Sequence, residues 1–307
     1  MPLTIRSTTI SDDVPAENRK ADRAVQSLTG TSRRETVGLF DHHCVWLNGT
    51  PCSAPWQRLA VGDTIEVRYY PAQRYLPQGK RARSAGLDIL FEDAHLIVVN
   101  KPPHCLTVPA PGHDKNTLVQ RLAAYLGRKP RRGPAVFTVQ RLDREASGVL
   151  VFAKSPEAWH QLRAQFAAHT PEREYAVIVA GRLDQQRGTI RSRLTTNRRL
   201  KRYSTSSTEP GELAVTRYEV QQQLADATYV RVRLETGRRN QIRVHFAEGG
   251  HPVLGDTRYE PLLAVHPRWP AKRLALHAVA LAFQHPMTGR RLQFEAPLPR
   301  EFRRFLG

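Results

Sequence analysis

The stretch that most constrains the fold is QRLDREASGVLVFAKS, residues 140–155. Its second half is an apolar run from Val149, and such a run between polar flanks is typical of a strand buried on both faces. A strand of this kind requires a large core with further elements on either side. The first half places Asp143 two residues after Arg141 and directly before Arg144. Two interpretations of Asp143 are open: a reacting carboxylate, or half of a salt bridge at the mouth of the strand.

Apolar periodicity predicts further elements between residues 87 and 307. A helix is expected after Ser155, which suits an N-cap and precedes Pro156 at the first helical position. Two strands are expected in LDILFEDAHLIVVNKPP, one strand in REYAVIVAG, one hairpin each in TRYEVQQQLADATYVRVRLETG and LHAVALAFQHPMTGRRLQFEAP, and a short helix in QIRVHFAEGG. Many strands with few helices indicate an α+β fold with a mixed, largely antiparallel sheet.

A smaller unit is expected in front of this region, over residues 18–70. It contains two short helical patterns, ADRAVQSLTG and TSRRETVGLF, and a hairpin signal at Asn48-Gly49. Two helices followed by short strands predict a small α/β unit. Arg33 and Arg34 on the second helix make this unit suitable for docking RNA.

The segments that flank the small unit are expected to lack regular structure. Residues 1–17 are polar, which predicts a flexible N-terminus. Residues 71–86 contain two prolines, two glycines and a basic run at Lys80, Arg81 and Arg83. This composition is typical of a linker.

The charge of the chain points to a polyanionic partner. Lys and Arg outnumber Asp and Glu by 47 to 28, which gives a formal net charge of +19. From residue 182 to residue 202 eight cations stand against Asp184 alone: Arg182, Arg187, Arg191, Arg193, Arg198, Arg199, Lys201 and Arg202. We interpret this segment as a loop that follows a phosphate backbone, the alternative being a solvated surface loop. Nucleic acid is therefore the expected partner.

Other classes of protein are disfavoured by the sequence. The three cysteines, Cys44, Cys52 and Cys105, form no CxxC pair, so neither a disulfide framework nor a zinc site is expected. The first twenty residues lack the apolar core of a signal peptide, and no apolar stretch approaches the roughly 18 residues of a membrane span. We therefore expect a cytoplasmic protein with no membrane association.

Five segments taken together resemble a known family: LIVVNKPP, QRLDREASGVLVFAKS, REYAVIVAG, LETGRRNQIRVHFAEGGHPVLGD and RLALHAVALAFQHPMTG. In this order they resemble the RluA-type RNA pseudouridine synthases over residues 87–307. Residues 18–70 resemble the small S-four-type RNA-binding domain that many of these enzymes carry. The resemblance implies isomerisation of uridine to pseudouridine in structured RNA, without cofactor or metal, by a protein that is normally a monomer.

The resemblance also implies roles for four residues. The aspartate of the R-L-D motif corresponds to Asp143, and the basic residue two positions before it, Arg141, would fill the space left by the flipped base. The tyrosine of the following strand corresponds to Tyr175, and the arginine of Q-I-R-V-H corresponds to Arg243. In chemical terms, breaking the N1–C1′ bond requires one ionised carboxylate that attacks C1′ or removes a sugar proton. A neighbouring arginine keeps such a carboxylate ionised, and an aromatic ring can hold the flipped base.

Four places depart from the family's pattern. Gln140 stands where histidine is usual, Ala146 where threonine is usual, Asn240 where histidine is usual, and His104-Cys105 where a glycine is usual. These departures leave open a second hypothesis, a non-catalytic RNA-binding or ribosome-assembly protein on the same fold. A nuclease using Asp143 and Glu145 is disfavoured, because metal-dependent cleavage needs more converging carboxylates. The target RNA is expected to be ribosomal, with transfer RNA as the alternative.

Overall fold

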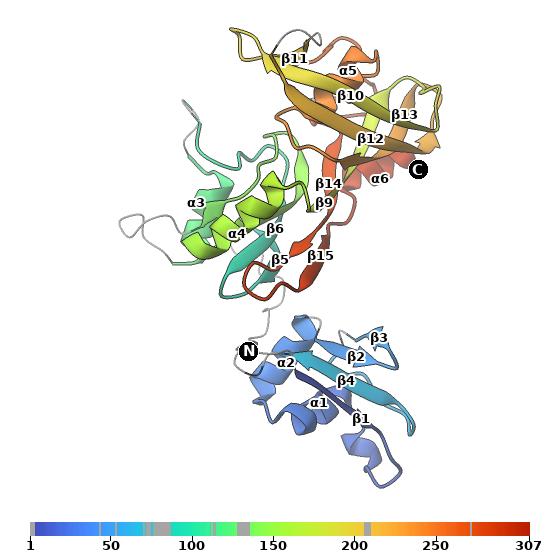
Figure 1. Cartoon of the computed structure of the whole chain (residues 1–307). Coiled ribbons are helices and arrows are strands. Elements are labelled where there is room, and N and C mark those ends of the chain that lie inside the picture. Colours follow the sequence, from blue (N-terminus) through green and yellow to red (C-terminus); the bar gives the residue numbers. More distant parts are fainter. Residues whose placement is uncertain are drawn as a thin grey trace. The chain divides into compact units, whose positions relative to one another are not determined.

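The computed structural model divides the chain into two compact units, residues 1–81 and residues 82–307 (Figure 1). The described residues are 4–42, 44–52, 54–69, 71, 75, 87–110, 112, 115–127, 136–205, 210–270 and 272–307. No helix within these ranges is long and apolar enough to cross a membrane.

Among its described residues, the small unit has a four-stranded antiparallel sheet, one 3-10 helix and two α-helices. The strands follow the order β1 (Thr4–Thr9), β4 (Thr64–Tyr69), β2 (Val45–Leu47) and β3 (Thr50–Pro51). Its helices are the 3-10 helix η1 (Ala16–Asn18), α1 (Ala21–Thr29) and α2 (Arg33–Asp41). Ser32 is the N-cap of α2 and forms a reciprocal capping box with Glu35. The apolar faces of α1, α2 and β4 form one core.

The expectation of a flexible segment over residues 1–17 is wrong. Strand β1 pairs with β4 along its whole length, from Thr4 opposite Tyr69 to Thr9 opposite Thr64. The next residue, Ile10, is buried in the core of the small unit. The sequence TIRSTT is polar because β1 is an edge strand with largely exposed side chains, yet its β-branched residues favour a strand.

The predicted linker, residues 71–86, contains a residue of the small core. Tyr75 is 4% exposed, and its ring lies edge-on to His42 at 5.6 Å and to Tyr69 at 6.4 Å. This burial makes Tyr75 part of the core of the small unit. The basic run Lys80, Arg81 and Arg83 lies outside the described residues.

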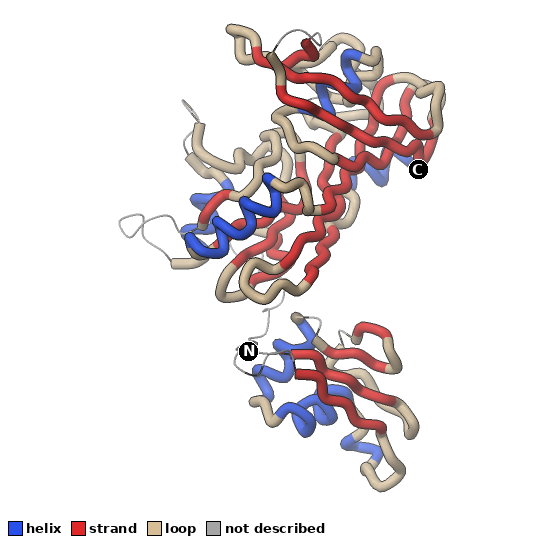
Figure 2. Tube along the Cα trace, viewed as in Figure 1, coloured by secondary structure: helices blue, strands red, loops and turns tan. Residues whose placement is uncertain are grey.

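The large unit is built on one eleven-stranded sheet (Figure 2). Its strands are β5 (Asp88–Glu92), β6 (Leu96–Lys101), β7 (Phe137–Thr138), β8 (Ser147–Ala153), β9 (Glu172–Ala180), β10 (Arg187–Thr196), β11 (Arg202–Thr205), β12 (Glu212–Gln223), β13 (Ala227–Leu234), β14 (Leu276–Gln284) and β15 (Arg291–Glu295). The main order is β11-β10-β12-β13-β9-β14-β8-β6-β5, with β15 on β14 and β7 on β8. All pairs are antiparallel except β14 with β8, which confirms the predicted α+β fold.

Strand β8 lies between two helical layers, as its apolar run predicts. On one face Val149 and Val151 pack in a cluster with Leu162 of α4 (Pro156–Ala167), and on the other face Leu150 and Phe152 pack with residues of α3 (Leu118–Tyr125). The predicted cap of α4 is confirmed, because the side chain of Ser155 accepts a hydrogen bond from the Ala158 N–H. The remaining helices are α5 (Gln241–Glu248) and α6 (Arg300–Leu306).

The parallel pair of β8 and β14 depends on Gly148. This residue has φ +118°, and a Cβ added to it would lie 2.2 Å from the carbonyl oxygen of Ala278. Glycine is therefore required where the two central strands come closest. Its position five residues after Asp143 places the Asp143 loop at the centre of the sheet.

The expectation that residues 182–202 form a loop is wrong. Residues 187–196 form strand β10, paired with β12 and β11, and β11 itself begins at Arg202. Side chains alternate along β10, so that Arg191 and Arg193 are exposed while Leu194 is buried. The charge of the segment obscures an alternating strand pattern, TIRSRLTT, which is the sequence signal for this structure. We call residues 187–205 the basic edge.

Candidate active site

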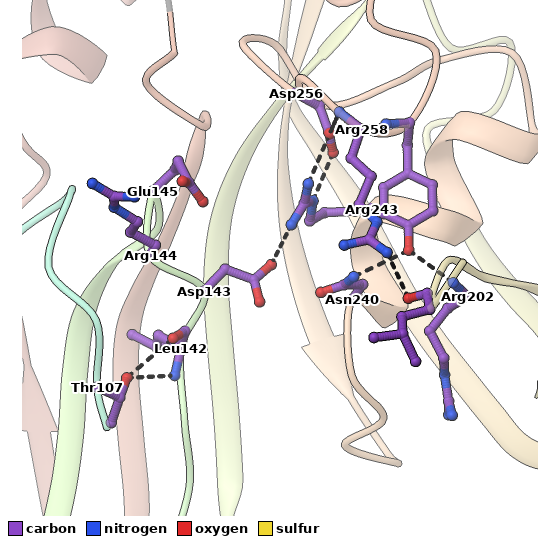
Figure 3. Close-up of polar contacts among 12 residues, drawn as sticks. Thr107, Leu142, Asp143, Arg144, Glu145, Arg202, Asn240, Arg243, Asp256 and Arg258 are labelled. Carbon is purple, nitrogen blue, oxygen red and sulfur yellow. Dashed lines mark hydrogen bonds and ion pairs between the residues drawn. The ribbon is translucent and has the colours of Figure 1, made fainter. Parts of the chain in front are cut away.

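The loop that carries Asp143, residues 139–146, is fixed through its backbone. The Thr107 hydroxyl donates to the Leu142 carbonyl at 3.0 Å and accepts from the Leu142 N–H at 3.4 Å (Figure 3). On the other side of Asp143, the ammonium of Lys101 donates to the carbonyl of Arg144 at 3.2 Å. We call residues 139–146 the Asp143 loop.

Two buried cations donate hydrogen bonds to the backbone of the Asp143 loop. Lys101 also donates to the carbonyls of Pro102 and Cys105, and burial lowers the pKa of Lys101 to about 8. Arg273 donates to the carbonyl of Glu145 at 2.9 Å and to the Ser147 hydroxyl at 2.7 Å, and burial lowers its pKa to about 10. Both cations bind carbonyl oxygens, so charge-assisted hydrogen bonds hold the backbone of the loop. Neither cation uses the Asp143 carboxylate for this purpose.

The carboxylate of Asp143 pairs with Arg243, a residue 100 positions later in the chain, on α5. Nη1 of Arg243 donates to Asp143 Oδ2 at 2.7 Å, while Nε and Nη2 donate to the two oxygens of Asp256 at 2.7 and 2.8 Å (Figure 3). The Asp256 side chain is fully buried, whereas that of Asp143 is 25% exposed. Burial opposes the charge of Arg243, but the Asp256 hydrogen bond and both carboxylates raise its pKa. Arg243 is thus a fixed positive charge beside a carboxylate that reaches solvent.

Asp143 opens into a cleft of about 800 Å³, enough for a nucleotide. Arg141 and Tyr175 line the same cleft. Six of the described residues that line it are arginines, and Asp143 is the one acid among them. Burial raises the pKa of Tyr175, and the nearby charge of Asp143 adds to this shift, so the phenol is neutral at physiological pH. A positive cleft lined by one carboxylate and the aromatic rings of Tyr175 and Phe166 suits a flipped nucleotide of an RNA chain.

The structure therefore brings together Arg141, Asp143, Tyr175 and Arg243, the four residues implied by the family resemblance. The predicted RNA-contacting residues Arg191, Arg193, Arg198 and Arg199 are exposed on the basic edge, and Lys201 and Arg202 are half-buried there. Arg33 and Arg34 are exposed in the first turn of α2 in the small unit. These two sets lie in different units.

Three of the departures from the family's pattern occupy distinct places. Ala146 is fully buried in the core, so it has a packing role. Gln140 lines the cleft, and its Nε2 atom has no hydrogen-bond partner among the described residues. Asn240 lines the cleft beside Asp143, at the start of α5.

Several residues of the site are missed by sequence reasoning. Thr107 and Lys101 hold the backbone of the Asp143 loop. Asp256 accepts hydrogen bonds from Arg243, and the Tyr259 ring packs against the Arg243 guanidinium. Asp256 lies in the segment HPVLGD, where an isolated aspartate after apolar residues is a weak signal for a buried ion pair. Within the described ranges, no group of three or more histidine, cysteine, aspartate or glutamate residues is placed to hold a metal.

Comparison with known proteins gives consistent matches. A family model described as RNA pseudouridylate synthase matches residues 95–248. An uncharacterized RNA pseudouridine synthase of Bacillus subtilis (strain 168) is 34% identical over 298 residues, covering 94% of this chain and 95% of the relative. A protein of Zymomonas mobilis named ribosomal large subunit pseudouridine synthase D is 35% identical, covering 92% of this chain and 91% of the relative. The solved structure of human RNA pseudouridylate synthase domain containing 1 shares the fold, with 24% identity, a TM-score of 0.57, and coverage of 70% of this chain and 84% of that one.

Proposed function

Because the chain belongs to the RNA pseudouridylate synthase family, we propose that it converts a uridine of structured RNA to pseudouridine with Asp143 as the catalytic carboxylate. The observation that carries this proposal is the ion-paired, partly exposed carboxylate of Asp143 in a cleft lined by arginines. Uracil leaves C1′ of the ribose, turns, and reattaches through C5. N1 gains a proton and C5 loses one, so the reaction is an isomerisation without net redox change.

The geometry supports a carboxylate that stays ionised while it is enclosed by substrate. Arg243 donates to Asp143 at 2.7 Å and is itself held by Asp256, so its charge cannot rotate away when RNA binds. A carboxylate with a fixed cation beside it can bond to C1′ or take a proton from the sugar. Both routes need the same ionised Asp143.

The cleft also offers support for a flipped nucleotide. The ring of Tyr175 supplies an apolar surface for the uracil, and burial keeps its hydroxyl neutral. Arg141 is exposed two residues before Asp143, at the position from which a side chain can occupy the gap in the RNA. We assign these two residues to base recognition and to stabilisation of the flipped state.

RNA affinity is proposed to come from surfaces outside the cleft. The basic edge presents Arg191, Arg193, Arg198 and Arg199 to solvent, with Lys201 and Arg202 at its turn. In the small unit Arg33 and Arg34 occupy the first turn of α2, where a helix dipole disfavours positive charge, so their placement favours an anionic partner. This supports an S-four-like, RNA-binding role for the small unit.

The proposed target is large-subunit ribosomal RNA. Relatives from Zymomonas mobilis, Pseudomonas aeruginosa and Vibrio cholerae carry the name ribosomal large subunit pseudouridine synthase D, at 33 to 35% identity. We propose that the protein acts on such RNA in the cytoplasm, as a monomer.

The test uses RNA labelled with tritium at C5 of uridine. Bulk ribosomal RNA transcribed without modification is incubated with the protein, and tritium release into water is measured. The wild type is expected to release tritium, and Asp143→Asn is expected to slow release by at least about a thousandfold. A matched control is Asp184→Asn, an exposed aspartate that is expected to leave release unchanged.

Two outcomes contradict the proposal in different ways. A wild-type protein that binds RNA but releases no tritium from ribosomal or transfer RNA would indicate a non-catalytic RNA-binding protein. Release that Asp143→Asn does not slow would leave the activity in place and remove Asp143 from its role.

A further inference from the structure

We infer that Asn240 is a positioning residue for the Asp143 carboxylate and that Tyr259 orients the Asn240 amide. The inference rests on the proposed function of Asp143. It gives the carboxylate a second donor besides Arg243, from the residue that begins α5.

The amide of Asn240 lies between a phenol and the carboxylate. With its oxygen toward Tyr259, Asn240 accepts from the Tyr259 hydroxyl at 3.0 Å, and its nitrogen donates to Asp143 Oδ1 at 3.1 Å and Oδ2 at 3.3 Å. The opposite orientation would set the amide oxygen against both carboxylate oxygens, where no proton is available. Amide orientation is assigned from such hydrogen bonding, and here the charge of Asp143 decides it.

The Tyr259 hydroxyl oxygen already accepts one hydrogen bond. It accepts from the backbone N–H of Arg202 at 3.2 Å, so its own proton is available for the amide oxygen of Asn240. The result is a directed chain of hydrogen bonds from the backbone of Arg202 through Tyr259 and Asn240 to Asp143. This chain begins on the basic edge and ends at the catalytic carboxylate.

Tyr259 is held firmly enough to serve this purpose. It is 3% exposed, and its backbone N–H donates to Asp256 Oδ1 at 3.0 Å. The guanidinium of Arg243 lies 5.2 Å from the centre of the ring, and the ammonium of Lys201 lies 5.4 Å from it. Its hydroxyl therefore has little freedom to turn away from Asn240.

The backbone of Asn240 restricts which side chains can replace it. Its φ is +57° and its ψ is +16°, a left-handed conformation that asparagine, aspartate and histidine adopt more readily than most residues. Among these, asparagine and neutral histidine each offer one acceptor for Tyr259 and one donor for Asp143. Aspartate keeps the shape and the acceptor but replaces the donor by a second negative charge.

The test compares Asn240→Asp with Asn240→His in single-turnover tritium release at saturating ribosomal RNA. Because a hydrogen bond to a charged group is lost and a like charge is added, Asn240→Asp is expected to lower the rate constant about 10- to 100-fold. Asn240→His is expected to stay within about threefold of the wild type, since it keeps the acceptor and the donor. Tyr259→Phe, which loses the orienting hydroxyl, is expected to fall between them.

RNA affinity and thermal melting separate positioning from a structural role. The dissociation constant for RNA and the melting temperature of Asn240→Asp are expected to stay near those of the wild type, because the side chain is isosteric and suits the same backbone. An unchanged rate in Asn240→Asp, or equal loss in Asn240→Asp and Asn240→His, overturns the inference while the wild-type activity stands. An inactive wild type overturns the proposed function itself.

Discussion

The Asp143 loop and the basic edge both contain arginines, but the loop is held by buried side chains whereas the edge is largely exposed. The loop is fixed at Leu142, Arg144 and Glu145 by three side chains that are themselves buried. The basic edge is a strand pair that presents Arg191, Arg193, Arg198 and Arg199 to solvent. Its turn is held at the Asn197 side chain, which accepts from the backbone N–H of Arg199 and Lys201, and at the Leu200 carbonyl, which accepts from Arg239 and Arg258.

The difference between the two regions corresponds to two functions of a charged residue, chemistry at a fixed position and binding of a polyanion. Chemistry on a nucleotide needs one carboxylate in a fixed place, so the loop is held by groups that leave that carboxylate open to the cleft. Binding a flexible polyanion needs many charges with free solvent access, and a fixed geometry adds little to it. Substitutions near the loop should therefore affect stability and turnover, whereas substitutions on the edge should affect affinity.

The largest expected effect concerns the ion pairs of the two regions. Asp256→Asn removes a fully buried partner of Arg243 and is expected to lower the free energy of unfolding by about 3 kcal/mol or more. The matched change is Glu212→Gln on β12, which breaks half-exposed pairs with Arg202 of the basic edge and with Arg238. It is expected to cost less than about 1 kcal/mol for each pair. Urea unfolding of both variants measures the contrast, and equal losses would contradict it.

The next effect is a pH dependence of stability caused by Lys101, which binds the backbone of the Asp143 loop. The pKa of Lys101 is about 8 in the folded protein, against an ordinary lysine value of 10.5, so between these values the unfolded chain binds the proton and the folded protein does not. Stability from this group therefore rises from pH 8 to pH 10.5, by up to about 3 kcal/mol. The raised pKa values of buried tyrosines act in the opposite direction in every variant.

The measurement is the difference in unfolding free energy between wild type and Lys101→Met across this pH range. Because the tyrosine contribution cancels in the difference, the wild type is expected to gain stability relative to the variant as the pH rises. A difference that stays constant with pH would show that Lys101 does not titrate in this window.

The smallest effect on the folded protein is expected on the basic edge. Arg191→Glu with Arg198→Glu should leave unfolding unchanged, because both side chains are exposed. RNA binding should weaken, and the slope of log affinity against log salt should flatten by about 0.7 to 0.9 for each phosphate that the variant no longer neutralises. An unchanged slope with a lower single-turnover rate would reverse the roles of the two regions.

Much of the fold follows from local sequence patterns. The capping box of Ser32 and Glu35, the turn at Asn48-Gly49 and the apolar run of β8 are each encoded within a few residues. Strands β1 and β10 were not predicted, because their polar or charged side chains belong to an edge and to a solvent-facing surface. Helix α3 was also not predicted, although its Leu118 and Leu122 pack in one cluster with Leu150 and Phe152 of β8.

For the site, the sequence allowed the four motif residues to be predicted but not the residues that hold them. Asp143, Arg141, Tyr175 and Arg243 could be named because they lie in motifs that resemble a family, and the structure brings them together. The supports could not be found in this way. Thr107 meets Leu142 across 35 positions and Arg243 meets Asp143 across 100, so these interactions exist only after the sheet has formed.

The central pairing of β8 with β14 has a consequence for the order of events during synthesis. Ser147 pairs with His277, so the centre of the sheet joins residues separated by more than a third of the chain. Pairings of this range slow folding, because a long loop must close before they stabilise the chain. A nascent chain that has emerged only through α5 lacks both Asp256 and β14. Synthesis itself therefore delays the assembly of the ion pairs around Asp143 until β14 has left the ribosome.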